Sequence, residues 1–511
     1  MRKLESKNKS PNLRIIFIPL LFFVALILVF LLTRNSDSID PNGETTKDPD
    51  EQATATDIQI TISHPTEPST PAPTFTPTPE PESFSQYKLS AIFDYEARHL
   101  AVDLTLTYIN QTGVTLDELL LLVDNNRYPG VFRLQEITWE DGQIASGYSL
   151  DGIRLTLPLR QPVSPEEKIT FSISYEINLP NIRGYFGWTE RQSNISDWYP
   201  YVPPYLPGEG WLARNPGTIG EHLSYDMAGF DVSIKLTSPT NRDGLPLTIA
   251  ASSKADFDGE WYHYRFEPAR NFVWSVSHLY QVQETTVGDI TVIGYAFPDH
   301  QAAEDTALNE AANALALFNE IYAPYPYDTF SVVEGDFLNG MEFSGLIFLS
   351  HAFYDFHPGT PMGNLTIITA HEVSHQWFYV LVANDQALEP WLDEATATYS
   401  EVLFYENVYP DLVDWWWDNR IYFHQPVGWV DSTIYETGAF YPFRDAVYLR
   451  GAMFLQDLRD LMGDENFFAF WQDYFAQYTN RLVTGDDFFN LLAEHTSIDL
   501  SGLLAEYFKY R

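Results

Sequence analysis

Two histidines, His371 and His375, stand four residues apart in the second half of the chain, and Glu394 follows after an interval of eighteen residues. Residues four apart share one face of an α-helix, so the two imidazoles would project toward one point. Two histidines and a carboxylate from a second helix form a standard ligand set for a catalytic zinc ion, whose fourth position is kept for water. The spacing therefore predicts two helices packed side by side, with His371, His375 and Glu394 as ligands of one metal ion.

Glu372 directly follows the first of these histidines and belongs to the same helical turn. A carboxylate at this place can take a proton from water without binding the metal, and can pass it to a leaving amine. We therefore predict that Glu372 is the general base of a hydrolytic reaction. The alternative is a helix that carries two histidines by chance, which the pattern H-E-x-x-H alone does not exclude. The helix is expected to run from about residue 366 to about residue 382.

The sequence around these residues resembles that of the zinc aminopeptidases of the membrane alanyl aminopeptidase family (gluzincins). The resemblance rests on HEVSHQWF from residue 371, EPWLDE from residue 389 and ATYSE from residue 397. The family's usual motifs are H-E-x-x-H-x-W-F-G-N and W-L-N-E-G-F-A, and the chain departs from them at Tyr379, Val380, Asp393, Ala395 and Thr396. None of these departures falls on a predicted ligand. The resemblance implies one zinc ion per chain, peptide substrates and a thermolysin-like, mostly α-helical catalytic domain.

Two further segments resemble motifs of the same family. The segment NGMEF, residues 339–343, is similar to the exopeptidase motif G-A-M-E-N, which implies that Glu342 binds the free α-amine of a peptide. The segment VYLRGA, residues 447–452, is similar to Y-x-K-G-A, which implies that the hydroxyl of Tyr448 stabilises the tetrahedral intermediate. The alternatives are a solvated loop glutamate for Glu342 and core packing for Tyr448.

Glu401 lies seven residues after Glu394, on the same face of the second predicted helix. Ligand histidines commonly donate their other ring N–H to a carboxylate, so Glu401 is a candidate for that supporting contact. A solvent-facing glutamate is the alternative. Members of the family also hold the substrate amine with a glutamine or an acidic residue of their N-terminal domain, but no stretch of this chain matches that motif, and no residue is assigned to the role.

These residues together predict a zinc-dependent metallopeptidase that removes amino-terminal residues from peptides, with Glu372 and Tyr448 as its catalytic residues. Two alternatives stay open. A zinc endopeptidase with the same fold would be favoured if Glu342 does not bind an amine. A catalytically inactive ectodomain that serves as a binding module would be favoured by the departures around both motifs.

The N-terminal part of the chain differs in composition from the rest. Residues 1–14 are basic, residues 15–32 form an uncharged run, and residues 33–83 are rich in Thr and Pro. The run is just long enough to cross a bilayer, and its basic flank should stay in the cytoplasm. We therefore expect a cytoplasmic tail, a transmembrane signal-anchor and a disordered stalk, with the catalytic domain outside the cell membrane. A cleaved signal peptide is the alternative.

The rest of the chain is expected to have an α+β fold with several domains. From residue 84 to residue 298, hydrophobic and polar residues alternate between turn signals, which predicts an antiparallel β domain similar to the family's β-saddle. From residue 299 to residue 511 the period becomes helical, as a catalytic domain of the expected kind requires. The formal net charge of −41 argues against nucleic acid as a partner. Cysteine is absent, which excludes disulfides and thiolate chemistry.

Overall fold

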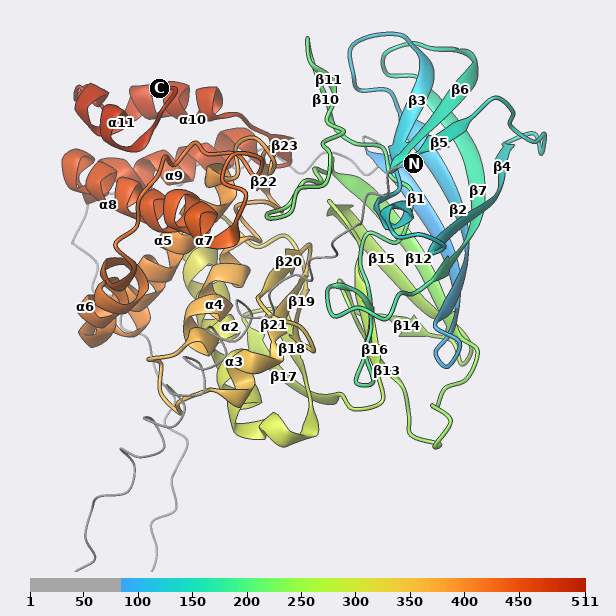
Figure 1. The fold of residues 1–511 in the computed structure, drawn as a ribbon, viewed down its shortest axis with the longest axis horizontal. Helices are drawn as coiled ribbons and strands as arrows, with labels where there is room; N and C mark the ends of the chain where they lie inside the picture. The colour runs from blue at the N-terminus through green and yellow to red at the C-terminus, as the bar shows by residue number, and fades with distance from the viewer. Residues whose placement is uncertain (1–83) are drawn as a thin grey trace, which may run out of the picture. The chain divides into compact units, whose positions relative to one another are not determined.

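The computed structural model describes residues 84–511 (Figure 1). Strands dominate the first part of this range, from blue to green in Figure 1, and helices dominate the last part, from orange to red. The fold is therefore α+β, with a β-rich N-terminal part and a helical C-terminal part, as the two hydrophobic periods predict. The predicted tail, anchor and stalk, residues 1–14, 15–32 and 33–83, lie outside the described residues.

A seven-stranded sheet is the largest of the β-rich part, with the strand order β14-β15-β12-β1-β2-β7-β4. Its strands are β1 (Ser85–Asp94), β2 (His99–Ile109), β4 (Phe132–Trp139), β7 (Lys168–Asn178), β12 (Ala228–Leu236), β14 (Asp256–Phe257) and β15 (Tyr262–Ala269). Every second residue of β2 from Leu100 to Leu106 is buried, because successive side chains of a strand point to opposite faces. Neighbouring strands are antiparallel, as predicted, except for β1 and β12, which are parallel.

Smaller sheets complete the β-rich part. A three-stranded sheet joins β3 (Leu116–Leu122), β6 (Arg154–Val163) and β5 (Ser149–Asp151). A four-stranded sheet joins β13 (Thr248–Ala251), β16 (Trp274–Ser277), β9 (Ser193–Ile195) and β8 (Phe186–Trp188). The short hairpin β10 (Tyr205–Leu206) and β11 (Gly210–Trp211) precedes a long loop, residues 212–227, and the 3₁₀ turn η2 (Asp124–Arg127) follows β3.

A five-stranded sheet, in the order β17-β18-β19-β21-β20, lies beside the helices (Figure 1). Its strands are β17 (Gln281–Val287), β18 (Ile290–Ala296), β19 (Thr329–Gly335), β20 (Met341–Phe343) and β21 (Leu346–Ser350). Every residue of β19 and β21 is buried, as expected for strands that are covered on both faces. Strands β17 and β18 precede the predicted domain boundary at residue 298, yet they pair with β19 in this sheet. The domain limits themselves stay a prediction.

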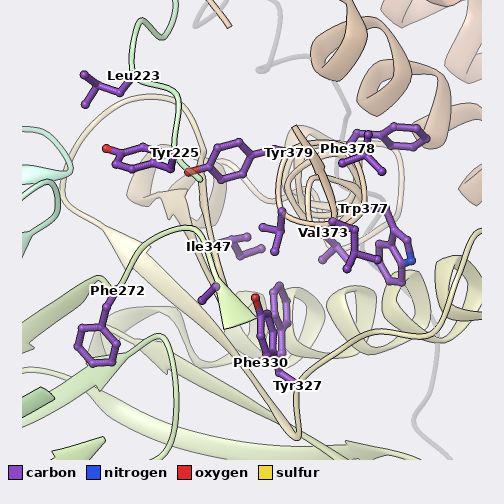
Figure 2. Close-up of a cluster of buried hydrophobic side chains, with 14 of the residues drawn as sticks. Leu223, Tyr225, Phe272, Tyr327, Phe330, Ile347, Val373, Trp377, Phe378 and Tyr379 are labelled. Carbon is purple, nitrogen blue, oxygen red and sulfur yellow. The ribbon is translucent and has the colours of Figure 1, made fainter. Parts of the chain in front are cut away.

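The helical part is built around α4 (Asn364–Ser374) and α5 (Trp391–Val408), which pack against each other. The other α-helices are α2 (Gln301–Ile321), α3 (His351–Asp355), α6 (Val413–Trp416), α7 (Phe440–Phe443), α8 (Arg450–Met462), α9 (Asp464–Tyr478), α10 (Gly485–His495) and α11 (Ser501–Tyr507). Two wide π-type turns, η5 (Trp417–Ile421) and η7 (Arg444–Leu449), and the two-stranded sheet of β22 (Val382–Ala383) and β23 (Arg481–Leu482) complete it. Trp377 and Phe378, just after α4, pack into the main hydrophobic core (Figure 2).

The first helix of the predicted pair is shorter than expected. The expectation extends to about residue 382, whereas α4 ends at Ser374 and His375 is its C-cap. Beyond it the backbone N–H of Val380 bonds to the carbonyl of His375 at 3.0 Å, five residues back, and Tyr379 has a φ of 130°. The side chain of Arg270, in the β-rich part, donates a hydrogen bond to the carbonyl of Val380 at 2.7 Å. A tertiary contact therefore holds the chain in the turn that follows the helix.

The predicted localisation requires a correction. No helix within residues 84–511 is long and apolar enough to cross a membrane. The longest described helix, α2, has 21 residues but carries four acidic ones, so its composition suits packing on a sheet rather than contact with lipid. This finding contradicts the prediction of a single-pass cell-membrane protein with an extracellular catalytic domain. The run proposed as its anchor, residues 15–32, lies outside the described residues.

Candidate metal centre and active site

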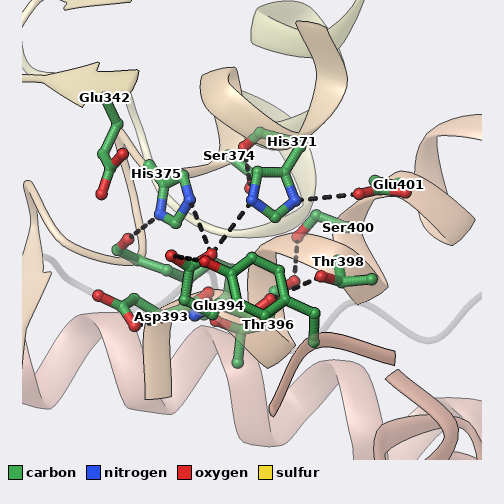
Figure 3. A network of polar contacts seen from close by, with 12 residues as sticks. Glu342, His371, Ser374, His375, Asp393, Glu394, Thr396, Thr398, Ser400 and Glu401 are labelled. Atoms are coloured by element: carbon green, nitrogen blue, oxygen red, sulfur yellow. Dashed lines mark hydrogen bonds and ion pairs between the residues drawn. The ribbon is translucent and has the colours of Figure 1, made fainter. Parts of the chain in front are cut away.

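Helices α4 and α5 bring His371, His375 and Glu394 together (Figure 3). The Nε2 atom of His371 lies 3.3 Å from Oε2 of Glu394, and Nε2 of His375 lies 3.7 Å from the same oxygen. All three side chains are buried. One potential ligand atom from each lies within 4.8 Å of the others. The three residues that the sequence spacing predicts as metal ligands therefore do lie close together.

The local sequence explains how α5 presents Glu394. Pro390 immediately precedes the helix, where its fixed φ suits a helix start and its missing N–H costs nothing. Asp393 and Glu394 lie in the first turn, where the helix dipole favours carboxylates. The backbone N–H of Glu394 donates to Oδ1 of Asp393 at 2.9 Å. These contacts hold the glutamate at the helix end that faces α4.

The two histidines are oriented so that Nε2 of each can bind a metal. Nδ1 of His375 lies 3.0 Å from the carbonyl oxygen of Phe378, which can only accept, so Nδ1 carries the proton. Nδ1 of His371 lies 3.0 Å from Oε1 of Glu401 and is arranged in the same way. Both Nε2 lone pairs are then directed to the side of Glu394. The donor set of two imidazole nitrogens and one carboxylate fits zinc.

Glu401 lies at the centre of a buried polar network behind His371. It is fully buried, and it accepts hydrogen bonds from Nε and Nη2 of Arg420, at 2.9 and 2.8 Å, and from Nε1 of Trp416, at 3.1 Å. Burial alone would raise the pKa of Glu401, but Arg420 and His371 hold it below its usual value. The carboxylate is therefore a charged acceptor for the His371 ring. Arg420 and Trp416 belong to no motif, and the sequence analysis missed both.

Glu372 is buried beside the same cluster of metal-binding candidates. Its Oε2 atom has no hydrogen-bond partner within residues 84–511. A Cβ atom at Gly340 would collide with the Glu372 carboxylate, so only glycine allows the chain before β20 to approach so closely. Burial, opposed by His371, raises the pKa of Glu372 to about 8. Within the described residues, the protein therefore provides no hydrogen bond to this buried oxygen.

Glu342, on β20, points into the site from the opposite side to α5 (Figure 3). One of its oxygens, one of Glu372 and a ring nitrogen of His375 lie within 4.8 Å of one another. Nε2 of Gln386 lies 3.5 Å from Oε1 of Glu342 and 3.1 Å from Oδ2 of Asp393. Burial, and then the nearby carboxylates, raise the pKa of Glu342 well above its usual value. A cation bound here would relieve that repulsion.

Glu221 is a further acidic residue of the site, and the sequence analysis missed it. It comes from the loop between β11 and β12, in the β-rich part. Burial, and then the charge of Glu394, raise its pKa to about 8. Its charge also acts on Glu342 and on Glu372, so the three carboxylates share one site. No motif surrounds Glu221, and only the folded loop brings it to the helices.

Tyr448 approaches the site from the wide turn η7, just before α8. Its hydroxyl donates to Oε1 of Glu394 at 2.6 Å, and its ring lies parallel to that of His371 at 6.0 Å between centroids. The structure thus brings together all of the residues that the sequence analysis selects: His371, Glu372, His375, Glu394, Glu401, Glu342 and Tyr448. Their proximity does not by itself assign a chemical role to any of them.

Comparison with known proteins agrees with this geometry. Residues 306–507 match the family model described as the peptidase family M1 domain. Aminopeptidase N of Lactobacillus helveticus is 26% identical over 295 residues, which are 52% of this chain and 34% of that protein. Endoplasmic reticulum aminopeptidase 1 of Mus musculus is 28% identical over 230 residues, which are 42% of this chain and 25% of that protein. The chain carries an M1 peptidase domain.

The M1 peptidase domain confirms the family resemblance that the H-E-x-x-H region indicates. The chain spans about a third or less of the length of the two curated relatives named above. Among solved structures, the M1 zinc metallopeptidase from Deinococcus radiodurans has a TM-score of 0.59 and 18% sequence identity, and the match covers 83% of this chain and 93% of that one. This likeness shows that the M1 fold extends over the β-rich part as well.

Proposed function

We propose that this protein is a zinc-dependent aminopeptidase, which hydrolyses the first peptide bond of peptides. The observation that carries the proposal is the presence of two acidic side chains, the buried Glu342 and the half-buried Glu221, beside the cluster of His371, His375 and Glu394. Buried carboxylates favour a bound cation, and the free α-amine of a peptide is largely cationic near neutral pH. The names of the two curated relatives, both aminopeptidases, support the same activity.

His371, His375 and Glu394 hold the metal in this proposal, and Glu401 orients the His371 ring. Zinc is the metal that suits two imidazole nitrogens and a carboxylate on two helices. A bound zinc ion supplies Lewis-acid activation of water and of the substrate carbonyl near neutral pH. The other steps belong to side chains of the protein.

Glu372 takes the proton from the attacking water and then donates it to the leaving amine. The free Oε2 of Glu372 supports this role, because no protein group within the described residues competes for it. The hydroxyl of Tyr448 donates a hydrogen bond to the developing oxyanion, and losing one such donor typically lowers kcat by about 10² to 10³.

Glu342 and Glu221 set the position of the substrate. When they hold the α-ammonium group, the peptide can advance no further, and its first peptide bond is the one that meets the water and Glu372. Gln386 supports Glu342 through its contacts with Glu342 and Asp393. Specificity for free amino termini then depends on the attraction of the α-ammonium group to Glu342 and Glu221. Cleavage depends on the water and Glu372 at the other end of the site.

The test compares free peptides with the same peptides N-acetylated. Acetylation removes the positive charge, and loss of one member of a desolvated charge pair costs about 2 to 5 kcal/mol. The value of kcat/KM should therefore fall about 30- to 3,000-fold. Glu342→Ala should cost a similar factor on free peptides but little on acetylated ones, because both changes remove the same interaction. Removing the metal with a chelator should abolish activity, and added zinc should restore it.

Glu118→Ala, which removes an exposed glutamate of β3, is the matched control and should leave both rates unchanged. Cleavage of acetylated peptides at internal bonds, as fast as free ones are trimmed, would favour the endopeptidase instead. A zinc-loaded protein that cleaves neither class would favour the inactive binding module.

A further inference from the structure

The loop before β20 carries an asparagine that is directly followed by a glycine, Asn339 and Gly340, within the segment NGMEF. The motif G-A-M-E-N, which this segment resembles, has glycine and alanine at the same two positions. Asparagine is a chemically labile residue, and a following glycine leaves its side-chain amide open to attack, because no Cβ atom shields the next backbone nitrogen. The chain therefore has a reactive pair of residues where the motif has an inert one.

The structure leaves both reacting groups of this pair free. Asn339 is exposed to solvent, and the neighbouring Leu338 is 70% exposed. Within residues 84–511, no hydrogen bond engages the side-chain amide of Asn339 or the backbone N–H of Gly340. Asn339 lies outside the helices and strands and has a φ of 77°, a left-handed conformation that asparagine tolerates. Neither secondary structure nor a side-chain partner therefore protects the amide.

The reaction open to such a pair is deamidation, which consumes only water. The backbone nitrogen of Gly340 loses its proton to hydroxide and forms a bond to Cγ of Asn339, while the bond from Cγ to Nδ2 breaks and ammonia leaves. Water then opens the resulting five-membered imide at one of its two carbonyls. Opening at Cγ gives aspartate, whereas opening at the backbone carbonyl gives isoaspartate, whose main chain is one methylene longer.

The loop has little room for a longer main chain. A Cβ atom at Gly340 would collide with the carboxylate of Glu372, so the backbone already lies against the proposed general base. On one side of the loop, the carbonyl of Phe337 accepts a hydrogen bond from Oγ of Ser350 at 2.7 Å, and on the other side β20 begins at Met341. An extra methylene between these anchors must therefore displace the contact with Glu372 or the start of β20.

We propose that Asn339 deamidates spontaneously in the folded protein, and that the isoaspartate form of residue 339 is inactive. The inactivation rests on the proposed aminopeptidase function, whereas the deamidation does not. Glu342, the proposed amine ligand, belongs to β20 and follows the lengthened bond closely, so it shifts relative to Glu372. The new carboxylate also adds a negative charge next to a site whose carboxylates already repel one another.

The experiment ages the purified, zinc-loaded protein in mildly alkaline and in mildly acidic buffer, and digests samples with chymotrypsin. Cleavage after Phe337 and Phe343 releases residues 338–343, and chromatography separates their asparagine, aspartate and isoaspartate forms. The asparagine form should disappear with time, and faster in the alkaline buffer, because the attacking nitrogen must lose its proton. Asn480 is the internal control: its φ of 67° is similar but arginine follows it, so it should stay unchanged over the same period.

Activity on free peptides, measured on the same samples, should fall in step with the formation of isoaspartate, while the zinc content stays constant. The isoaspartate form should retain about one hundredth of the initial kcat/KM, since a displacement of about 1 Å at a reacting group costs about 10²-fold. Asn339→Asp adds the charge without lengthening the chain, and should lose less activity than the isoaspartate form.

Asn339→Gly is the matched variant, because glycine adopts the φ of 77° without strain and has no amide to lose. It should start with the activity of the wild type and keep it during ageing. An Asn339 that persists as long as Asn480 would overturn the inference. Full conversion with unchanged activity, or an Asn339→Gly variant that loses activity at the wild-type rate, would overturn the inactivation. Fresh protein that cleaves no peptide would overturn the proposed function, while conversion of Asn339 in that protein would still support the deamidation.

Discussion

At the scale of single residues, the site combines carboxylates that repel one another with a carboxylate whose charge is fully paired. Glu401 is the fully paired one, since its side chain is completely buried and its two oxygens accept from His371, Arg420 and Trp416. Such a carboxylate fixes the tautomer and the direction of the ligand histidine. We therefore expect metal binding to depend on Glu401, although its oxygens are occupied by other partners.

Glu401→Gln should weaken zinc binding by about 10- to 100-fold, because glutamine keeps the shape but not the charge that Nδ1–H of His371 donates to. Competition with a chelator of known affinity measures the effect. Glu406→Gln, on the same helix but paired with Arg459 away from the site, is the control and should bind zinc as the wild type does. Unchanged zinc affinity in Glu401→Gln would show that His371 is oriented by other contacts.

At the scale of elements, α2 is a helix whose buried residues are mostly apolar but include an acidic side chain. Ala307, Leu308, Ala311 and Leu315 are buried among the core, as the helical period predicts. Glu304 is buried on the same helix, and neither of its carboxylate oxygens has a hydrogen-bond partner within residues 84–511. An ionised carboxylate at this place costs stability.

The stability of the protein should therefore depend on pH through Glu304. Burial, and then Asp305, raise its pKa from 4.5 to about 7. Between these two values the folded protein keeps a proton that the unfolded chain has lost, so stability falls as pH rises through this window. Glu304→Gln removes this loss, and thermal unfolding at about pH 8 should occur at a higher temperature than in the wild type, with the difference shrinking toward about pH 4.5.

Glu320→Gln, at an exposed position of α2, is the control for Glu304 and should leave the unfolding temperature unchanged at both pH values. An unfolding temperature of Glu304→Gln that follows the wild type at every pH would mean that Glu304 reaches solvent.

At the scale of the whole described chain, one arginine joins segments that lie far apart in sequence. Arg270 is buried and follows β15, and it donates to the carbonyls of Tyr225, Val380, Leu381 and Arg481 at 2.8, 2.7, 3.3 and 3.0 Å. These carbonyls belong to the loop that carries Glu221, to the turn after α4 and to β23. One planar fork thus holds the β-rich part against the helices at the site.

Arg270→Lys should destabilise the protein by roughly 3 to 5 kcal/mol, because an ammonium group cannot reach four carbonyls and leaves buried acceptors unpaired. Denaturant unfolding measures the loss. Zinc affinity should fall in the same variant, since the turn after His375 loses its support. Arg459→Lys, whose arginine pairs with Glu406 and Asp464 within the helical part, should cost less. Equal losses in the two variants would contradict a special role for Arg270.

Several features of this structure follow from the local periodicity of the sequence alone. The spacing of His371, His375 and Glu394 requires two adjacent helices, and Pro390 and Gly463 mark where helices begin and end. Alternation along β2 predicts its buried face. These features follow from the 3.6- and 2-residue repeats of the backbone, which depend only on neighbouring residues.

Other features depended on contacts between distant segments. The turn after α4 is held by Arg270, more than a hundred residues earlier, and the parallel pairing of β1 with β12 also joins segments more than a hundred residues apart. Glu221 lies on a loop and Arg420 on the wide turn η5, and neither belongs to a motif. Hydrogen bonds and electrostatic interactions between such residues produce no periodic pattern in the sequence. Their strength depends on burial and on distance, and both are defined only in the folded chain.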